Sequence, residues 1–185
     1  GGCWQTAIAE RDIMNWIADD LRAHGVGVWN IEYRGVDRGG GYPATYQDVG
    51  AAADLFATKR GEFGFRTDTP VGTIGHSAGG HLSLWLVRRS ALAKGDALRG
   101  LAPLLVDVAI SQGGLPDLRA QMMLPDHGCG NEAAAKMAGA KFNSSNVIWS
   151  QFAPCDGAFT PARHRNQRSS GQSRQMGLGR VERRC

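Results

Sequence analysis

Apolar residues recur with the spacing of a helix in four segments of the chain. The pattern predicts helices over residues 11–24, 43–60, a stretch from just after residue 77 to about residue 89, and 131–138. One face of the first helix consists of Ile13, Trp16, Ile17 and Leu21. Glycine at position 25 is placed to end this helix, and proline at position 43 is placed to begin the second.

Three short runs rich in β-branched and aromatic residues predict strands between these helices. They cover residues 26–33, 69–75 and 101–110. Because strands alternate with helices of about 12 residues, we expect right-handed crossovers and a mostly parallel sheet with helices on both faces. The sequence therefore predicts an α/β domain over residues 1–140.

The periodic pattern decays from about residue 141. Residues 161–185 hold seven arginines, no lysine and very few apolar residues. Such a segment lacks the apolar surface needed to offset the entropy of ordering it, so we expect residues 141–185 to form a degenerate or disordered Arg-rich tail. A natural tail and a terminus translated out of frame both fit this composition.

The charge of the chain is concentrated in that tail. The net charge is +4, of which residues 161–185 contribute +6 and residues 1–160 contribute −2. The predicted domain has no basic bias, so we expect no nucleic-acid partner. Its longest apolar stretch, residues 101–110, is well short of the roughly 20 residues that span a bilayer. We therefore expect no membrane span. We also expect a cytoplasmic location, and the sequence does not indicate an oligomeric state.

The cysteines have no spacing typical of a metal site. Cys3, Cys129, Cys155 and Cys185 form no CxxC or Cys/His pattern. We expect free or buried thiols, with a Cys129–Cys155 disulfide as the alternative in an oxidising compartment. The sequence contains no phosphate-binding or dinucleotide-binding motif either, so no metal and no cofactor is expected.

The segment Gly75-His-Ser77-Ala-Gly79 matches the pattern G-x-S-x-G. In this pattern the serine occupies a strained turn between a strand and a helix, and its hydroxyl projects above the sheet. The glycines allow the strand and the helix to approach each other closely. The match falls where the predicted strand 69–75 gives way to a helix, which favours a nucleophilic serine over a serine in an ordinary glycine-rich turn.

Further segments make the pattern specific in combination. They are GGCW at the start of the chain, NIEYRG, GGGYP, TYQDV and GHSAGGHL. Together they resemble the bacterial α/β-hydrolases related to arylformamidase (kynurenine formamidase), which carry an HGGxW motif at the oxyanion hole. The resemblance covers residues 1–139 and places the first residue just after the histidine of that motif. We therefore expect a partial α/β-hydrolase fold, truncated at both ends.

The resemblance implies a role for several residues. Ser77 would be the nucleophile, and the backbone N–H groups of Gly2, Cys3 and Ala78 would form the oxyanion hole. The implied reaction is hydrolysis of a small-molecule carboxylic ester or small amide through an acyl-serine intermediate. Carboxylesterase is the general expectation, and arylformamidase activity is one possibility within it.

The general base and its acid are harder to assign. His76 lies on the sharp turn and points away from its neighbour Ser77, and His81 lies four residues beyond on the predicted helix, so neither is expected to act as the base. The resemblance implies the chain order serine, acid, histidine. Asp156 and His164 follow that order and are the candidate acid and base, but they lie too close together for an intervening strand and helix. The alternative is therefore a non-catalytic fragment or pseudoenzyme that lacks the triad acid and histidine.

Overall fold

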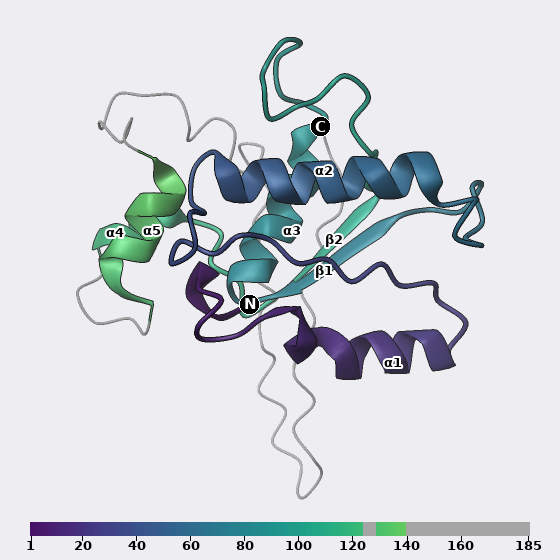
Figure 1. The fold of residues 1–185 in the computed structure, drawn as a ribbon, viewed down its shortest axis with the longest axis horizontal. Coiled ribbons are helices and arrows are strands. Elements are labelled where there is room, and N and C mark those ends of the chain that lie inside the picture. The colour runs from purple at the N-terminus through teal and green to yellow at the C-terminus, as the bar shows by residue number, and fades with distance from the viewer. Residues whose placement is uncertain (124–128, 140–185) are drawn as a thin grey trace, which may run out of the picture.

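The computed structural model describes residues 1–123 and 129–139 (Figure 1). Its elements, in chain order, are two short 3-10 helices, five α-helices and two strands: η1 (Gly2–Trp4), η2 (Arg11–Met14), α1 (Asn15–Ala23), α2 (Ala44–Lys59), β1 (Gly72–His76), α3 (Ala78–Arg89), β2 (Val108–Gln112), α4 (Leu118–Met123) and α5 (Gly130–Ala138). The predicted helices are confirmed to within a few residues. The short helix α4 was not predicted.

The two strands form a small parallel sheet. β1 pairs with β2 in a register that runs from Gly72 opposite Val108 to His76 opposite Gln112. Parallel neighbours require a crossover connection, and α3 provides it by packing against both strands. α2 packs in turn against α3. The described residues thus form a mixed helix and strand structure around a βαβ unit, consistent with part of an α/β fold.

The strand predicted over 101–110 is largely wrong, because only its last residues belong to β2. Gly100 turns the chain with a φ of 72°, and Leu101 and Leu105 are exposed. Pro103 has no N–H to contribute to a strand ladder. Regular pairing therefore begins only next to Asp107, whose backbone N–H donates to the Val71 carbonyl at 2.8 Å.

The strand predicted over residues 26–33 is also wrong. This segment is irregular and is exposed or half-buried along its length. Within the described residues its backbone N–H groups make hydrogen bonds only at the two ends, from Val26 to the Leu21 carbonyl and from Tyr33 to the Glu32 carboxylate. β-propensity mainly measures packing against neighbouring strands, and none lies beside this segment in the described part of the chain. Its aromatic residue Trp29 instead stacks on Phe63, with ring centroids 5.2 Å apart.

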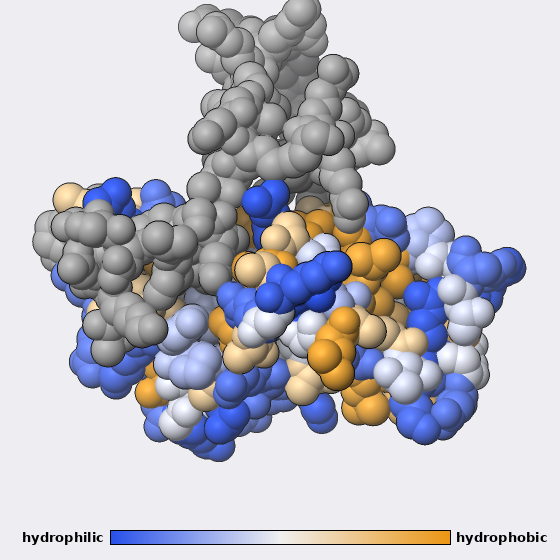
Figure 2. Space-filling model, turned by 90° about the horizontal axis from the view of Figure 1, so that it is seen from above, coloured by the Kyte–Doolittle hydropathy of each residue, from blue (hydrophilic) through white to orange (hydrophobic). Residues whose placement is uncertain are grey.

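Helix α1 forms where the pattern predicts it, but its apolar face is not buried. None of its residues is buried, and Trp16 is 80% exposed. Gly25 ends the helix with a φ of 78°, as expected. Apolar side chains thus remain at the surface. Figure 2 shows hydrophobic residues among hydrophilic ones on the face seen from above.

The core lies instead between η1, α2, α3 and α5. Its largest fully buried side chains include Trp4, Tyr46, Trp85 and Met137, one from each of these elements. The Tyr46 hydroxyl donates to the Met137 carbonyl at 3.2 Å and joins α2 to α5. No helix in residues 1–123 or 129–139 has the length and apolar character needed to cross a membrane. The predicted tail, residues 141–185, lies outside the described residues.

Candidate active site

Ser77 is the single residue between β1 and α3. Its backbone torsions are φ 51° and ψ −116°, outside the regions of strand and helix. A non-glycine residue in this conformation costs about 1–3 kcal/mol and is held only by its surroundings. Here the Ser77 N–H donates to the Gln112 carbonyl at 2.8 Å, and the Ser77 carbonyl accepts from the His81 N–H at 3.2 Å. The strained turn between strand and helix that the sequence predicts is therefore present.

The two glycines of the pattern differ in their steric role. A side chain on Gly75 would overlap the carbonyl group of Gly79, so this position requires glycine. A Cβ on Gly79 would lie 3.6 Å from the Gly1 nitrogen, which is an ordinary contact. The expectation that both glycines prevent a clash is thus wrong for Gly79. The tight approach is made instead by Gly80, whose Cβ would lie 2.6 Å from the Ser111 Oγ.

The start of the chain lies against this turn. The 3-10 helix η1 packs against α3, and the Trp4 indole N–H donates to the His81 Nδ1 at 3.2 Å. Cys3 and Trp4 are both left-handed, with φ values of 51° and 56°. Together with Ser77, they are the non-glycine residues with positive φ in the described part of the chain. Backbone strain is therefore concentrated in two segments that lie side by side.

The segment that follows η1 is held by the glycine-rich loop that precedes α2. The Asp37 carboxylate accepts hydrogen bonds from the N–H groups of Thr6 and Ala7, at 3.0 and 2.9 Å. These bonds, the one from Ala7 most, hold the pKa of Asp37 below its ordinary value. The Val36 N–H donates to the Trp4 carbonyl at 2.7 Å. No sequence motif marks Asp37, and only its place in the glycine-rich loop could have drawn attention to it.

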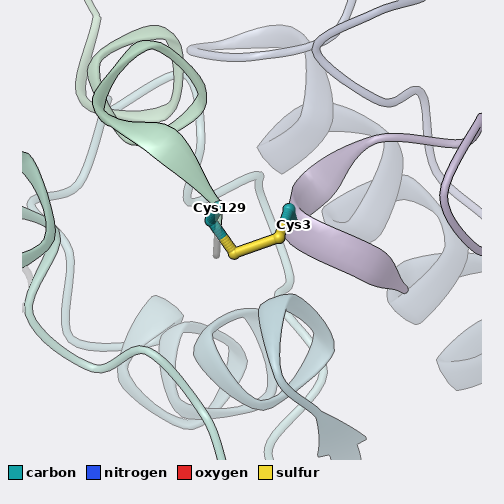
Figure 3. The surroundings of a disulfide bond; sticks show 2 residues. All are labelled: Cys3 and Cys129. Atoms are coloured by element: carbon teal, nitrogen blue, oxygen red, sulfur yellow. A yellow bond between two sulfur atoms is a disulfide. The ribbon is translucent and has the colours of Figure 1, made fainter. Parts of the chain in front are cut away.

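Cys3 is bonded to Cys129, which corrects the expectation of free thiols (Figure 3). The disulfide joins η1 to the residue that precedes α5. The two cysteines are 126 residues apart in the sequence, and no motif connects them. Because Cys129 is bonded to Cys3, the alternative Cys129–Cys155 pairing is also wrong.

Comparison with known proteins identifies the chain through its sequence as a whole. The family model BD-FAE matches residues 1–156. The chain belongs to the BD-FAE family. This is a family of α/β-hydrolase-like esterases, so the chain is of the esterase-like hydrolase class. No curated protein and no solved structure gives a significant match.

The two histidines near Ser77 in this BD-FAE chain occupy different environments. His76 is exposed at the end of β1. His81 is 2% exposed, and burial lowers its pKa from 6.5 to about 3. It is therefore neutral at physiological pH, and its Nδ1 accepts the hydrogen bond from Trp4. Such a nitrogen is already engaged and cannot at the same time take a proton from a serine hydroxyl.

The acidic residues that follow α3 in this BD-FAE chain serve local structure where they are described. Asp107 accepts a hydrogen bond from the Val71 N–H, and Asp117 accepts from the N–H groups of Arg119 and Ala120 at the start of α4. Asp156 and His164, the proposed acid and base, lie outside the described residues. The described residues also contain no cluster of three or more side chains that could hold a metal ion.

Proposed function

We propose that this BD-FAE chain is a serine hydrolase that acts on a small-molecule carboxylic ester or small amide through an acyl-serine intermediate. Ser77 is the nucleophile in this proposal. The observation that carries it is the conformation of Ser77, with φ 51° at the junction of β1 and α3. Strained residues cluster at functional sites. In a nucleophile at a strand-to-helix turn, the strained backbone makes the serine hydroxyl project above the sheet.

The stabilisation of the oxyanion is assigned to backbone N–H groups on both sides of the turn. Ala78 begins α3 directly after Ser77, and Gly2 and Cys3 belong to η1, which packs against the same helix. The proposed donors are the N–H groups of Gly2, Cys3 and Ala78. Negative charge develops on the carbonyl oxygen only in the tetrahedral transition state, so fixed donors there lower the barrier without binding the substrate more tightly.

The substrate is proposed at the level of its reacting group. Membership of an esterase-like family supports a carboxylic ester, and the resemblance of GHSAGGHL and the other segments to arylformamidase-related hydrolases supports a small amide as the alternative substrate. Specificity in this fold comes from loops around the site, and the fold itself accommodates many acyl groups. Carboxylesterase activity is therefore the general assignment, with arylformamidase activity within it.

A second candidate is a non-catalytic chain built on the same scaffold. It is favoured by the state of the two nearby histidines, because His76 is exposed at the end of its strand and His81 is buried and already hydrogen-bonded. A serine hydroxyl is a weak nucleophile unless a base removes its proton. Asp156 and His164 are the proposed partners, and the second candidate holds if they do not act on Ser77.

Labelling with a fluorophosphonate tests the proposal directly, because this reagent requires an activated serine. We expect covalent labelling of the parent chain at Ser77, located by peptide mass mapping, and none in Ser77→Ala. Hydrolysis of p-nitrophenyl acetate should be lost in the same variant. Ser83→Ala is the matched control, because Ser83 lies on the same helix but is buried, and this variant should label like the parent.

The outcome for the two partner residues separates the candidates. If His164→Ala and Asp156→Ala reduce labelling as Ser77→Ala does, the three residues act together. A parent chain that folds but neither labels nor turns over ester faster than Ser77→Ala would contradict the serine hydrolase proposal and support the non-catalytic scaffold.

A further inference from the structure

We propose that His81 is a positioning residue, which holds the turn of residues 2–4 beside Ser77 by accepting the hydrogen bond from the Trp4 indole. The effect of this bond on the reaction at Ser77 rests on the proposed function, whereas its effect on the conformation of residues 2–4 does not. Nothing in the G-x-S-x-G pattern assigns a task to the residue four positions after the serine, and His81 is one of the few fully buried polar side chains in the described part of the chain.

His81 is connected to both halves of the proposed site. Its backbone N–H donates to the Ser77 carbonyl at 3.2 Å in the first turn of α3. Its Nδ1 accepts from the Trp4 indole at 3.2 Å. His81 thus donates one hydrogen bond to the proposed nucleophile Ser77 and accepts another from Trp4. Because Trp4 directly follows Cys3, His81 links Ser77 to a proposed oxyanion-hole donor.

The His81 ring is held in one orientation by its neighbours. Trp4 packs edge-on against it with centroids 5.4 Å apart and planes at 87°, and Tyr46 packs edge-on at 5.9 Å and 77°. Burial of a polar ring costs free energy unless it is hydrogen-bonded, and an apolar residue would fill the same space without that cost. The bond to Trp4 is thus a specific reason for histidine at this position.

The turn that this bond restrains needs support from outside. Cys3 and Trp4 are consecutive left-handed residues, and each costs about 1–2 kcal/mol relative to an ordinary conformation. The disulfide to Cys129 restrains the first of them, and the bond to His81 restrains the second. Without the second restraint the turn can relax, which moves the N–H groups of Gly2 and Cys3 from the position of the developing oxyanion. Displacements of about 1 Å in such groups reduce rates by about 100-fold.

Substitutions at both ends of the bond test the proposal. His81→Leu removes the acceptor at similar volume, and His81→Asn keeps an acceptor oxygen close to the position of Nδ1. Trp4→Phe removes the donor. The matched control is Trp85→Phe, because Trp85 is also buried and packs on Tyr46, but its indole N–H has no hydrogen-bond partner among the described residues.

We expect fluorophosphonate labelling of Ser77 to be about 100-fold slower in His81→Leu and in Trp4→Phe, and no slower still when the two are combined. His81→Asn should recover most of the rate, and Trp85→Phe should label at the parent rate. For ester hydrolysis the loss should fall on kcat, with KM little changed, since the oxyanion forms only in the transition state.

Hydrogen exchange makes the test independent of catalysis. The amides of residues 2–5 should exchange at least about tenfold faster in His81→Leu than in the parent and in His81→Asn, whereas the amides of β1 should be unchanged. If the parent shows no labelling at Ser77, the proposed function fails and this exchange alone decides the positioning role. A folded His81→Leu that exchanges like the parent at residues 2–5 overturns the inference, and so does one that labels within about twofold of the parent rate.

Discussion

At Gly75 the absence of a side chain allows the end of β1 to touch the first turn of α3. A Cβ there would overlap the carbonyl group of Gly79, which is backbone and cannot rotate away. We expect Gly75→Ala to lower the free energy of unfolding by about 1–3 kcal/mol, as overpacking does elsewhere. Urea unfolding followed by circular dichroism measures this.

Gly79→Ala is the matched control for that experiment, since its Cβ would make only an ordinary contact. Gly79 lies within α3, where alanine is the better helix former, so this variant should not be destabilised. Its free energy of unfolding should differ from that of the parent by less than about 1 kcal/mol. Equal losses in the two variants would show that the strand and the helix are not as close as described.

His81 gives the stability of the protein a defined pH dependence. Its pKa in the folded state is about 3, below the ordinary value of 6.5, because burial disfavours the charged ring. As the pH falls from 6.5, the unfolded chain takes up a proton at this histidine and the folded chain does not. The free energy of unfolding should therefore fall with decreasing pH, by up to about 1.4 kcal/mol per pH unit between about pH 6.5 and 3.

Urea unfolding at several pH values, compared between the parent and His81→Asn, measures this contribution. The slope should be smaller in the variant. An identical slope in the parent and in His81→Asn would show that the His81 ring of the parent is accessible to protons in the folded state.

Among the contacts between elements, the disulfide connects the most distant parts of the sequence. It closes a loop of 126 residues, and cross-links of this length stabilise the folded state by about 2–5 kcal/mol, mainly by restricting the unfolded chain. We expect a reductant to lower the free energy of unfolding of the parent by that amount and to have little effect on the double variant Cys3→Ser/Cys129→Ser.

Tryptic mapping without reduction should show peptide 1–11 linked to peptide 120–136. A link from 120–136 to 142–163 instead would indicate the Cys129–Cys155 pairing.

Helices α2 and α3 are joined by an ion pair. Arg89, which is 4% exposed, contacts the Asp54 carboxylate through both terminal nitrogens, at 2.6 and 2.7 Å. Removal of one partner leaves a buried charge uncompensated, so we expect Asp54→Ala to lower the free energy of unfolding by about 3 kcal/mol. The exposed pair Arg66–Asp68 provides the control, and Asp68→Ala should lower the free energy of unfolding far less, because solvent screens an exposed pair. Similar effects of the two substitutions would contradict the burial of Arg89.

For the molecule as a whole, the arrangement of core and surface predicts a gradient of local stability. β1 is paired with β2 and covered by α3, whereas residues 27–32 donate no backbone hydrogen bond within the described part of the chain. We expect amides 73–76 to be among the slowest to exchange with solvent and amides 27–32 to exchange at nearly unprotected rates. Exchange followed by NMR or mass spectrometry measures both. Slow exchange at 27–32 would indicate that these amides are hydrogen-bonded, as in the strand that the sequence pattern predicts.

The sequence by itself determined the features that depend on neighbouring residues. Helices α2, α3 and α5 follow from apolar spacing, and the turn at Ser77 follows from a pentapeptide placed between a strand and a helix. Each of these is decided by interactions within a few residues, which is the range that a local pattern records. Family membership rests on a match over residues 1–156, a range far longer than any one motif.

Tertiary structure decided what depends on partners far away in the chain. The run 26–33 has the composition of a strand but no strand beside it in the described residues, and the apolar face of α1 is not buried. Trp4 meets His81 because η1 packs against α3, and the fold also brings Cys3 of η1 to Cys129, the residue before α5. A sequence pattern records which side chains could be buried or bonded, whereas the packing of distant segments selects the partner that each one has.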